Sequence, residues 1–374
     1  MPTDLAHEQR ILIVRLSALG DVVHVLPLLD VLRRARPDAH IGWLVEERAA
    51  SLLEGHPQID RLWIAPRREV SGLWRERRYA KAVSRLRETV RALRDARYEV
   101  TIDAQCNFRS SSWARISGAP RRIGFAPPYT KEKGHWLSTE RVHAPVGGQL
   151  KVHRNLELLK AQGIDTGDAR AVLPLPESAR VSARALRQSI AAPRAIALHP
   201  GVSGHGAIKQ WPLPRFAALA RRLRDDVDAR CLVTWGPEER ALAEEVVAAS
   251  EGAAELAPAT GSLLELGALY EECDVVVGGD TGPLHLAAAL GVPVVGLYGP
   301  KDPAIYGPWN GRTGTVSTIV WKQVHCSPCR LRRCGNVICM PAIQVDDVVA
   351  AVRRTLDDSA PRTDRSPRQV GLRA

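Results

Sequence analysis

The sequence lacks the features that mark several large classes of protein. It has only 3 Phe and 6 Tyr among 374 residues, too few for an aromatic platform that stacks nucleic-acid bases, although 9 Trp are scattered through it. It contains no G-x-G-x-x-G motif, which argues against a dinucleotide-binding protein. No apolar window reaches the roughly 18 uninterrupted residues that a membrane span needs. We therefore expect a water-soluble protein that does not bind nucleic acid.

Export signals are absent too, and basic side chains are in excess. The N-terminal residues are polar and carry Asp4 and Glu8 ahead of an apolar run, unlike a secretory signal peptide. We therefore expect a cytoplasmic protein whose seven cysteines stay mostly reduced. Lys and Arg number 52 against 41 Asp and Glu, which gives a formal net charge of +11. This balance favours an anionic partner, such as a phosphorylated metabolite, an acidic glycolipid or a membrane surface.

Apolar runs and amphipathic patterns alternate along most of the chain, which predicts an α/β fold. The expected strands are 11–16, 41–45, 61–64, 100–103, 195–199, 231–235, 275–278 and 294–298, and the expected helices are 22–35, 75–97, 213–223, 238–250 and 345–356. The alternation pauses at 127–145 and 172–193, so we expect two doubly wound domains, 1–175 and 176–356. Residues 357–374 are polar and aperiodic and should be disordered. Ligands of such sheets lie beyond the carboxyl ends of the strands, which points to the cleft between the halves.

The first stretch whose residues could carry chemistry joins the first expected strand to its helix. Residues 15–21 have the sequence RLSALGD. Gly20 lets the backbone turn tightly, and Asp21 opens the helix at the ligand-binding edge of the sheet. The carboxylate of Asp21 could act on a ligand, or it could simply favour the positive end of the helix.

The second stretch is GGDTGPLHLAAALG at residues 278–291, where another strand gives way to a helix. Pro283 suits the first helical turn, and free amides around Gly282 would bind phosphate. A capped turn explains the glycines and the proline. It does not explain why Asp280, Thr281 and His285 occur there.

The third stretch follows the strand expected at 195–199, with HPGVS at 199–203 and KQWP at 209–212. The loop amides and the Ser203 hydroxyl could surround the oxygens of a diphosphate, and the ammonium of Lys209 could oppose its charge. A surface lysine is the simpler explanation for Lys209 alone. Its spacing from the loop favours the phosphate site.

Together these stretches resemble the lipopolysaccharide heptosyltransferase family of bacterial glycosyltransferases. The resembling segments follow one another in order: 11–27, WLVEE at 43–47, IDAQ at 102–105, KQW at 209–211, WGPEER at 235–240, DTG at 280–282 with His285, and YGPKDP at 298–303. The first three are most similar to the heptosyltransferase I type, which adds the first heptose to the Kdo sugar of the inner core.

The resemblance implies a GT-B fold of two Rossmann-like domains facing across a cleft. It also implies an ADP-heptose donor held mainly by the C-terminal domain, inversion at the anomeric carbon, and catalysis without a metal. It places the general base at Asp21. Residues that we expect to bind the donor are Ser203, Lys209, Glu238, Glu239, Asp280, Thr281, Gly282 and His285.

The acceptor implied by the resemblance is anionic, because Kdo is a carboxylate sugar on a phosphorylated lipid. The enzyme would then contact the inner membrane peripherally. Basic side chains crowd one segment of the N-terminal domain, and we expect these to bind the acceptor: Arg67, Arg68, Arg75, Arg78 and Arg109. A solvated basic face is the alternative for each of them. Many relatives of the heptosyltransferase I type have glycine where this chain has Cys106. This difference leaves the identity of the acceptor open.

Four of the seven cysteines crowd into the segment 325–340. Four thiolates on short loops suit tetrahedral zinc or iron, so a structural ion is one interpretation of Cys326, Cys329, Cys334 and Cys339. Reduced thiols and two disulfides are the alternatives, and the expected compartment argues against disulfides. Some relatives that add heptose to autotransporter proteins hold iron in a cysteine quartet, so the motif also keeps a protein acceptor open.

The sequence thus predicts an inverting heptosyltransferase that acts on the lipopolysaccharide core. One alternative is a heptosyltransferase with a protein or another glycan as its acceptor. The other is a non-catalytic module that binds a nucleotide sugar. Asp21, Lys209 and Asp280 are all present, which counts against the non-catalytic module.

Overall fold

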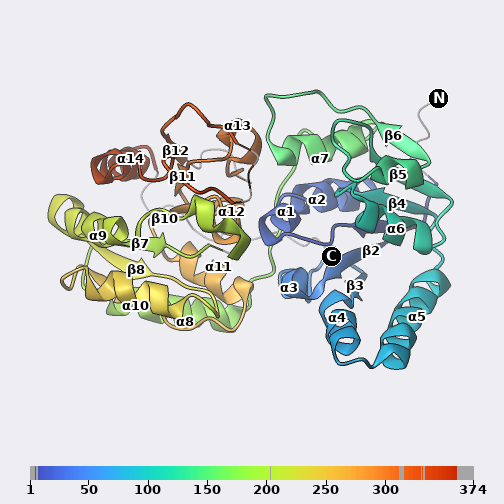
Figure 1. Ribbon diagram of the computed structural model, residues 1–374, viewed down its shortest axis with the longest axis horizontal. Coiled ribbons are helices and arrows are strands. Elements are labelled where there is room, and N and C mark those ends of the chain that lie inside the picture. Colours follow the sequence, from blue (N-terminus) through green and yellow to red (C-terminus); the bar gives the residue numbers. More distant parts are fainter. Residues whose placement is uncertain are drawn as a thin grey trace. The chain divides into compact units, whose positions relative to one another are not determined.

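The computed structural model describes residues 5, 7–202, 204–310, 316–329, 331 and 333–359, without the side chains of residues 204 and 205. The described chain forms two compact units (Figure 1). The N-terminal unit runs to Leu175 and takes in Ser262–Leu264, and the rest from Pro176 onward forms the C-terminal unit. Within the described ranges, no helix is long and apolar enough to cross a membrane.

The N-terminal unit is built on a six-stranded parallel sheet in the order β3-β2-β1-β4-β5-β6. Its strands are β1 (Arg10–Val14), β2 (His40–Glu46), β3 (Arg61–Ala65), β4 (Val100–Asp103), β5 (Arg121–Phe125) and β6 (Glu140–Val142). In the central register, Ile13 of β1 lies between Trp43 of β2 and Ile102 of β4. The strand order reverses between β1 and β4, so the carboxyl ends of these two strands form the switch point where doubly wound sheets bind ligands.

Two helices expected in this unit have other bounds in the structure. The elements are α1 (Leu19–Val23), α2 (Leu26–Ala35), α3 (Glu47–Ala50), α4 (Arg67–Arg75), α5 (Tyr79–Asp95), α6 (Phe108–Ile116), the short 3-10 helix η1 (Gly134–Leu137) and α7 (Lys151–Lys160). The helix expected at 22–35 restarts with Pro27 in its first turn, where proline is favoured. The helix expected at 75–97 corresponds to α5, which begins at Tyr79, and the preceding helix α4 was not expected. Arg77 between them has φ 59°, a conformation that ends a helix.

The C-terminal unit repeats the same topology. Its six parallel strands have the order β12-β11-β10-β7-β8-β9. With β7 counted as the first strand and the sheet read from its other edge, this is the order of the first sheet. They are β7 (Arg194–His199), β8 (Ala229–Val233), β9 (Ala254–Leu256), β10 (Val275–Gly279), β11 (Val294–Tyr298) and β12 (Ser317–Trp321). The helices are α8 (Glu177–Ser189), η2 (Gly204–Lys209), α9 (Leu213–Val227), α10 (Arg240–Ala248), α11 (Leu263–Glu271), α12 (Gly282–Ala289), α13 (Pro303–Tyr306) and α14 (Val345–Asp357).

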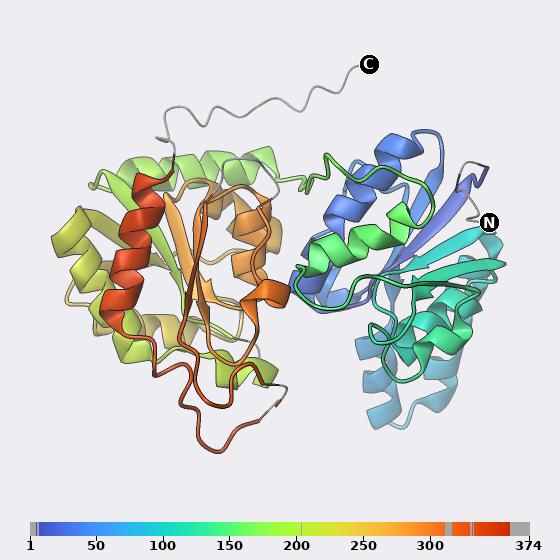
Figure 2. The ribbon, with the colours of Figure 1, turned by 90° about the horizontal axis from the view of Figure 1, so that it is seen from above.

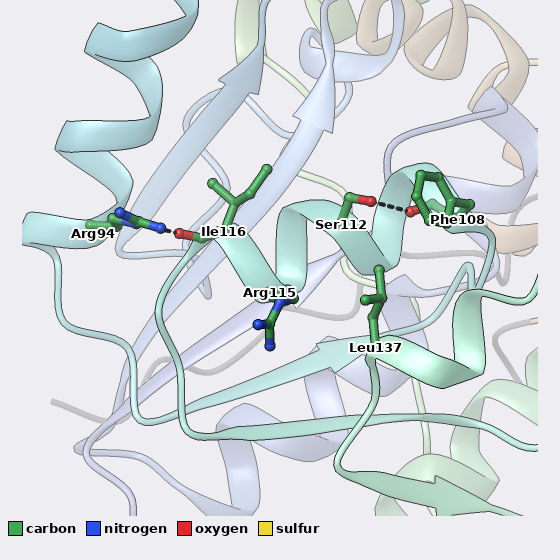
Figure 3. Close-up of a pocket in the computed structure, with 6 residues that line it drawn as sticks. All are labelled: Arg94, Phe108, Ser112, Arg115, Ile116 and Leu137. Carbon is green, nitrogen blue, oxygen red and sulfur yellow. Dashed lines mark hydrogen bonds between the residues drawn. The ribbon is translucent and has the colours of Figure 1, made fainter.

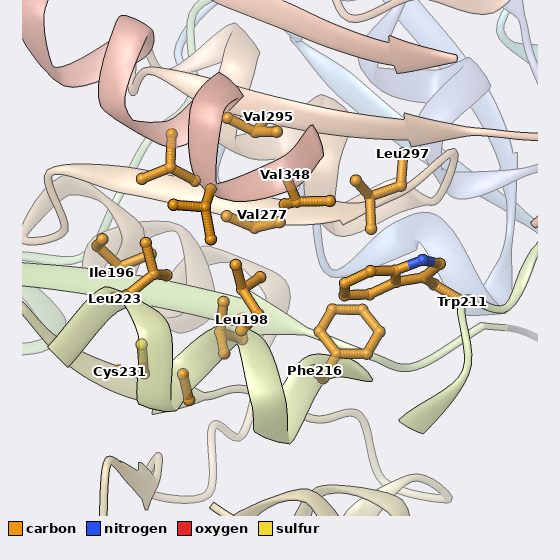
Figure 4. Packing of buried hydrophobic residues seen from close by; sticks show 14 of the residues in the cluster. Ile196, Leu198, Trp211, Phe216, Leu223, Cys231, Val277, Val295, Leu297 and Val348 are labelled. Atoms are coloured by element: carbon orange, nitrogen blue, oxygen red, sulfur yellow. The ribbon is translucent and has the colours of Figure 1, made fainter. Parts of the chain in front are cut away.

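The core of the C-terminal unit lies between its sheet and helices α9, α10 and α14 (Figure 4). Trp211 and Phe216 meet edge to face, with ring centroids 4.9 Å apart, and the indole of Trp211 donates a hydrogen bond to the carbonyl of Ile343. Helix α12 covers the opposite face of the sheet. Gly296 lies on that face, and a Cβ added to it would be 3.2 Å from the side chain of Leu284 in α12. The sheet is therefore covered on both faces, as parallel sheets require.

Segments expected to lack regular structure hold three elements. The connection expected at 172–193 contains α8, and the loop expected at 127–145 contains η1 and β6. Helix α8 buries only Ala183 among its 13 residues. Helix α14 reaches Asp357, the first residue of the tail expected to be disordered, and residues 360–374 lie outside the described residues. Figure 2 shows both units from above.

Candidate functional site

Asp21 lies in the first turn of α1, directly beyond the carboxyl end of β1, and two cations hold its carboxylate. A guanidinium nitrogen of Arg15 lies 2.7 Å from Oδ2, and Lys151 Nζ donates a hydrogen bond to Oδ1 at 2.5 Å. Arg15 is itself anchored, since it donates a 2.6 Å hydrogen bond to the carbonyl of Ala104 beyond β4. Both carboxylate oxygens of Asp21 therefore face positive charge.

The pKa of Asp21 reflects this environment. Burial on its own would raise the pKa, but the charges of Arg15 and Lys151, with a smaller contribution from His24, outweigh it. The pKa is held well below the ordinary value of an aspartate. Asp21 is consequently ionised at neutral pH and weakly basic while both cations stay in place.

The segment after β4 fixes the loop that carries Asp21. The side-chain carbonyl of Gln105 accepts hydrogen bonds from the amides of Leu16 and Ser17, at 2.9 and 3.4 Å. Asp103 holds Gln105 in turn, because its Oδ1 accepts a 3.0 Å hydrogen bond from the backbone amide of Gln105. Asp103 also accepts from Ser111 Oγ at 2.7 Å, and burial raises its pKa. The Asp-Ala-Gln element thus ties β4 to the loop after β1.

The arginines expected to bind the acceptor fall into two groups. Arg67 and Arg109 both pair with Glu46, the last residue of β2, at 3.3 and 3.2 Å. Arg109 also reaches Ser17 Oγ at 3.4 Å, which brings it to the loop of Asp21. The amide of Arg68 donates to the neighbouring carboxylate of Glu47 at the start of α4.

Arg75 and Arg78 belong to the second group. Arg75 ends α4, about 12 Å along the helix axis from Arg67, and donates to the carbonyl of Ser71. Arg78 pairs with Glu76 at 3.1 Å. Sequence reasoning could not separate these arginines from Arg67, because α4, which places Arg67 and Arg75 at its opposite ends, was not expected as a helix.

In the C-terminal unit, Lys209, Asp280 and His285 form one polar group beside β10. Lys209 Nζ donates to Asp280 Oδ2 at 2.5 Å, and Nε2 of His285 lies 3.1 Å from Asp280 Oδ1. The side chains of Asp280 and His285 are 9% and 5% exposed. Burial would raise the pKa of Asp280, but the hydrogen bond and charge of His285 and the charge of Lys209 hold it well below its ordinary value. Asp280 therefore orients both Lys209 and His285.

The N-terminus of α12 begins immediately after this group. Thr281 is the N-cap residue, yet its side chain caps no amide. Its Oγ1 is buried and has no hydrogen-bond partner within the described part of the chain. Gly282 starts the helix, and Pro283 occupies its first turn. A buried hydroxyl without a partner beside free helix amides is the arrangement that a bound phosphate would satisfy.

Of the two adjacent glutamates, only Glu239 turns toward the polar end of β7. Its Oε2 accepts from the amide of Gly236 at 2.9 Å and lies 3.6 Å from Nε2 of the buried His199. A Cβ added to Gly201 would come within 2.7 Å of three atoms of this carboxylate, so a side chain there would displace Glu239. Glu238 is exposed. Ser203 lies outside the described residues.

The interpretation of the cysteine quartet as a metal site is not supported. All four thiols are free, and the described part of the chain contains no group of three or more His, Cys, Asp or Glu side chains placed to hold a metal ion. Cys334 Sγ contacts the carbonyl of Asn336 at 3.2 Å, Cys326 is exposed and Cys339 is buried. Sequence spacing brings cysteines close along the chain but does not turn their side chains toward one point.

Solved structures share this pair of Rossmann-like units. A glycosyl transferase family 9 structure from Veillonella parvula covers 96% of this chain and 99% of its own, with a TM-score of 0.75 and 24% identity. The E. coli heptosyltransferase WaaC with ADP covers 92% of this chain and 99% of its own, with a TM-score of 0.70 and 23% identity. The fold is therefore the GT-B fold of glycosyltransferases.

The sequence comparisons define the family within that class. The sequence model of glycosyltransferase family 9 (heptosyltransferase) matches residues 86–337. Lipopolysaccharide heptosyltransferase 1 of Pseudomonas aeruginosa is 31% identical over 87% of both chains. The protein of the same name from Salmonella typhimurium is 29% identical over 80% of this chain and 90% of its own. The chain belongs to glycosyltransferase family 9, and it is a glycosyltransferase.

Proposed function

We propose that the protein transfers heptose from ADP-heptose to the Kdo of the lipopolysaccharide inner core, with inversion at the anomeric carbon. The observation that carries this proposal is the 31% identity to a lipopolysaccharide heptosyltransferase 1 across 87% of the chain. The polar groups beyond β1 and β10 supply the chemistry that such a transfer needs.

Asp21 is the proposed general base. An inverting transfer needs a group that takes the proton from the acceptor hydroxyl as that oxygen attacks the anomeric carbon, while the bond from this carbon to the diphosphate breaks. Asp21 is ionised, partly exposed and fixed by two cations at the switch point of its sheet. Arg15 and Lys151 weaken it as a base while both contact it.

An anionic acceptor would correct this weakness. The carboxylate of Kdo would compete with Asp21 for Lys151 or for Arg15, and any cation drawn toward Kdo raises the pKa of Asp21. Arg67 and Arg109 offer further positive charge at Glu46, close to Ser17 of the same loop. The base would thus be strongest when the correct acceptor is bound.

Donor binding falls to the C-terminal unit in this proposal. Lys209, the Thr281 hydroxyl and the first amides of α12 would hold the diphosphate and stabilise the negative charge that grows as ADP departs. Asp280 would position Lys209 and His285, and Glu239 would accept hydrogen bonds from sugar hydroxyls. The ammonium and the amides supply positive charge, so this chemistry needs no metal ion.

The proposed acceptor also implies where the enzyme works. Kdo is attached to a lipid that is anchored by its acyl chains, so the reaction would take place at the cytoplasmic face of the inner membrane. Peripheral contact with that membrane is part of the proposal.

A panel assay with mass spectrometry of the products tests the proposal. Purified protein is incubated with ADP-heptose and, in separate reactions, with a Kdo-bearing lipid, a Kdo-free lipid A and a peptide acceptor rich in Ser and Thr. We expect a mass increase of one heptose on the Kdo lipid alone. Transfer only to the peptide would replace lipopolysaccharide with a protein acceptor, and transfer to none of them would refute the proposal.

A further inference from the structure

The helical hairpin α4–α5 exposes apolar side chains that a folded protein would ordinarily bury. Trp74 of α4 and Tyr79 of α5 are 55% and 48% exposed, and their rings contact each other with centroids 4.9 Å apart. Val83 and Leu86 continue the series along α5 and are 37% and 40% exposed. These four side chains, which we name the outer stripe, form a continuous apolar feature at i, i+4 and i+7 spacing on α5.

The outer stripe is not a by-product of core packing. Helix α5 spans 17 residues and buries only Ala82, Thr89 and Leu93. At about 100° of rotation per residue, Tyr79, Val83 and Leu86 lie beside these buried positions but extend the apolar arc further into solvent. The arc is therefore wider than the surface that α5 covers within its own unit, and exposed apolar surface of this kind marks an interaction site.

Positive charge surrounds the outer stripe. Residues 67–97 contain 11 Lys and Arg against 4 Asp and Glu. On the helix, Arg87 and Arg94 flank the exposed edge of the stripe, with Arg91 next to them. A helix with an apolar face that includes aromatic residues and a polar face rich in arginine is typical of segments that lie on anionic lipid surfaces.

A pocket adjoins the C-terminal end of α5 and, like the outer stripe, combines apolar and arginine side chains (Figure 3). It has a volume of about 480 Å³ and is lined by Arg94, Phe108, Ser112, Arg115, Ile116 and Leu137. Phe108 is 56% exposed, and the guanidinium of Arg115 makes no hydrogen bond or ion pair within the described part of the chain. Burial and, after it, the charge of Arg115 lower the pKa of Arg122, so positive charge is crowded here.

We propose that the outer stripe and the adjoining pocket dock the protein on an anionic phospholipid bilayer. Trp74, Tyr79, Val83 and Leu86 would enter the interface, and Arg87, Arg91 and Arg94 would contact lipid phosphates. Each Lys or Arg near such a surface strengthens binding about fivefold. The inference rests on the proposed function in one respect, which is that a lipid-anchored acceptor gives the docking its purpose. Helix α4 also begins at Arg67, the residue that pairs with Glu46 near the loop of Asp21.

Vesicle cosedimentation of the full chain tests this proposal without requiring catalysis. The probes are phosphatidylcholine vesicles and vesicles that also contain phosphatidylglycerol. We expect wild-type protein to bind the anionic vesicles, and binding to weaken as salt is raised. The variant Arg87→Gln/Arg91→Gln should bind about 25-fold more weakly, and Trp74→Ser/Leu86→Ser should lose at least tenfold.

A matched control comes from α8 in the other unit, where Val181 is 54% exposed and Arg184 is 47% exposed. The variant Val181→Ser/Arg184→Gln should bind like wild type, and circular dichroism should show that all variants are folded. The proposal would be overturned if wild-type protein did not bind anionic vesicles, or if the hairpin variants bound them as wild type does. Vesicle binding that depends on the hairpin in a protein that transfers no heptose would refute the proposed function and leave this inference standing.

Discussion

Lys151 of α7 donates its hydrogen bond to the oxygen of Asp21 that Arg15 does not contact. The two cations reach Asp21 from different parts of the sequence, because Arg15 follows β1 and Lys151 begins a helix at the other end of the unit. The carboxylate is fixed in orientation and kept ionised. Its strength as a base therefore depends on whether both cations remain beside it.

Removing Lys151 should move the acid limb of the pH profile. The ionised form of Asp21 is the active form, so kcat/KM falls as the pH drops through its pKa. Lys151 lowers that pKa, so Lys151→Met should raise it and shift the acid limb to higher pH. The measurement is kcat/KM against pH. Lys160→Met on the same helix, where Lys160 pairs with Glu157, should leave the limb in place. An unshifted limb in Lys151→Met would separate Lys151 from the base.

Gln105 should act as a positioning residue for the loop of Asp21. Gln105→Leu removes the acceptor of two loop amides, which should cost about 1–3 kcal/mol of unfolding free energy and lower kcat. Gln105→Glu keeps a side-chain oxygen and should retain more kcat than the leucine variant. Denaturant unfolding and steady-state kinetics measure both effects. Gln149→Leu is the control, since Gln149 bonds the carbonyl of Pro145 on the surface. Equal kcat in the leucine and glutamate variants would contradict this role.

Lys209→Ala should weaken the binding of ADP roughly 10- to 100-fold and slow turnover, because a charge-assisted hydrogen bond is worth about 1.5–3 kcal/mol. Isothermal titration calorimetry measures the first effect. Lys322→Ala provides the comparison, since Lys322 forms an ion pair with Asp347 in the same unit. If calorimetry gave the same ADP affinity for Lys209→Ala as for wild type, Lys209 would have no part in donor binding.

The strands of both sheets could largely be predicted, because buried parallel strands are continuous apolar runs. The strands expected at 100–103 and 294–298 have the same bounds in the structure. Strands β5, β6, β9 and β12 were missed. Strands β6 and β9 have only three residues each, β5 opens with two arginines, and β12 is mostly half-buried, so none of them is a continuous apolar run. The break before Leu26 was also missed, because apolar periodicity continues across it, and helix α4 was not expected.

Motifs next to strand ends led to Asp21, Asp280 and Lys209, because parallel strands bring their carboxyl ends to one edge. Lys151 could not be found this way. It begins a helix far along the chain, and only the packing of α7 brings it to Asp21. Nor could sequence distinguish Glu239 from Glu238, since the choice depends on the turn at Gly236.

The most direct test of the account is heptose transfer from ADP-heptose to a Kdo-bearing lipid by wild-type protein and by Asp21→Asn, with calorimetry of donor binding alongside. We predict that the variant loses a factor on the order of 10² to 10⁴ in rate while its affinity for donor stays within a few fold. Asp165→Asn, which alters an exposed turn at Gly167, should keep the wild-type rate. An Asp21→Asn variant that retains most of the wild-type rate would contradict the assignment of Asp21 as the base.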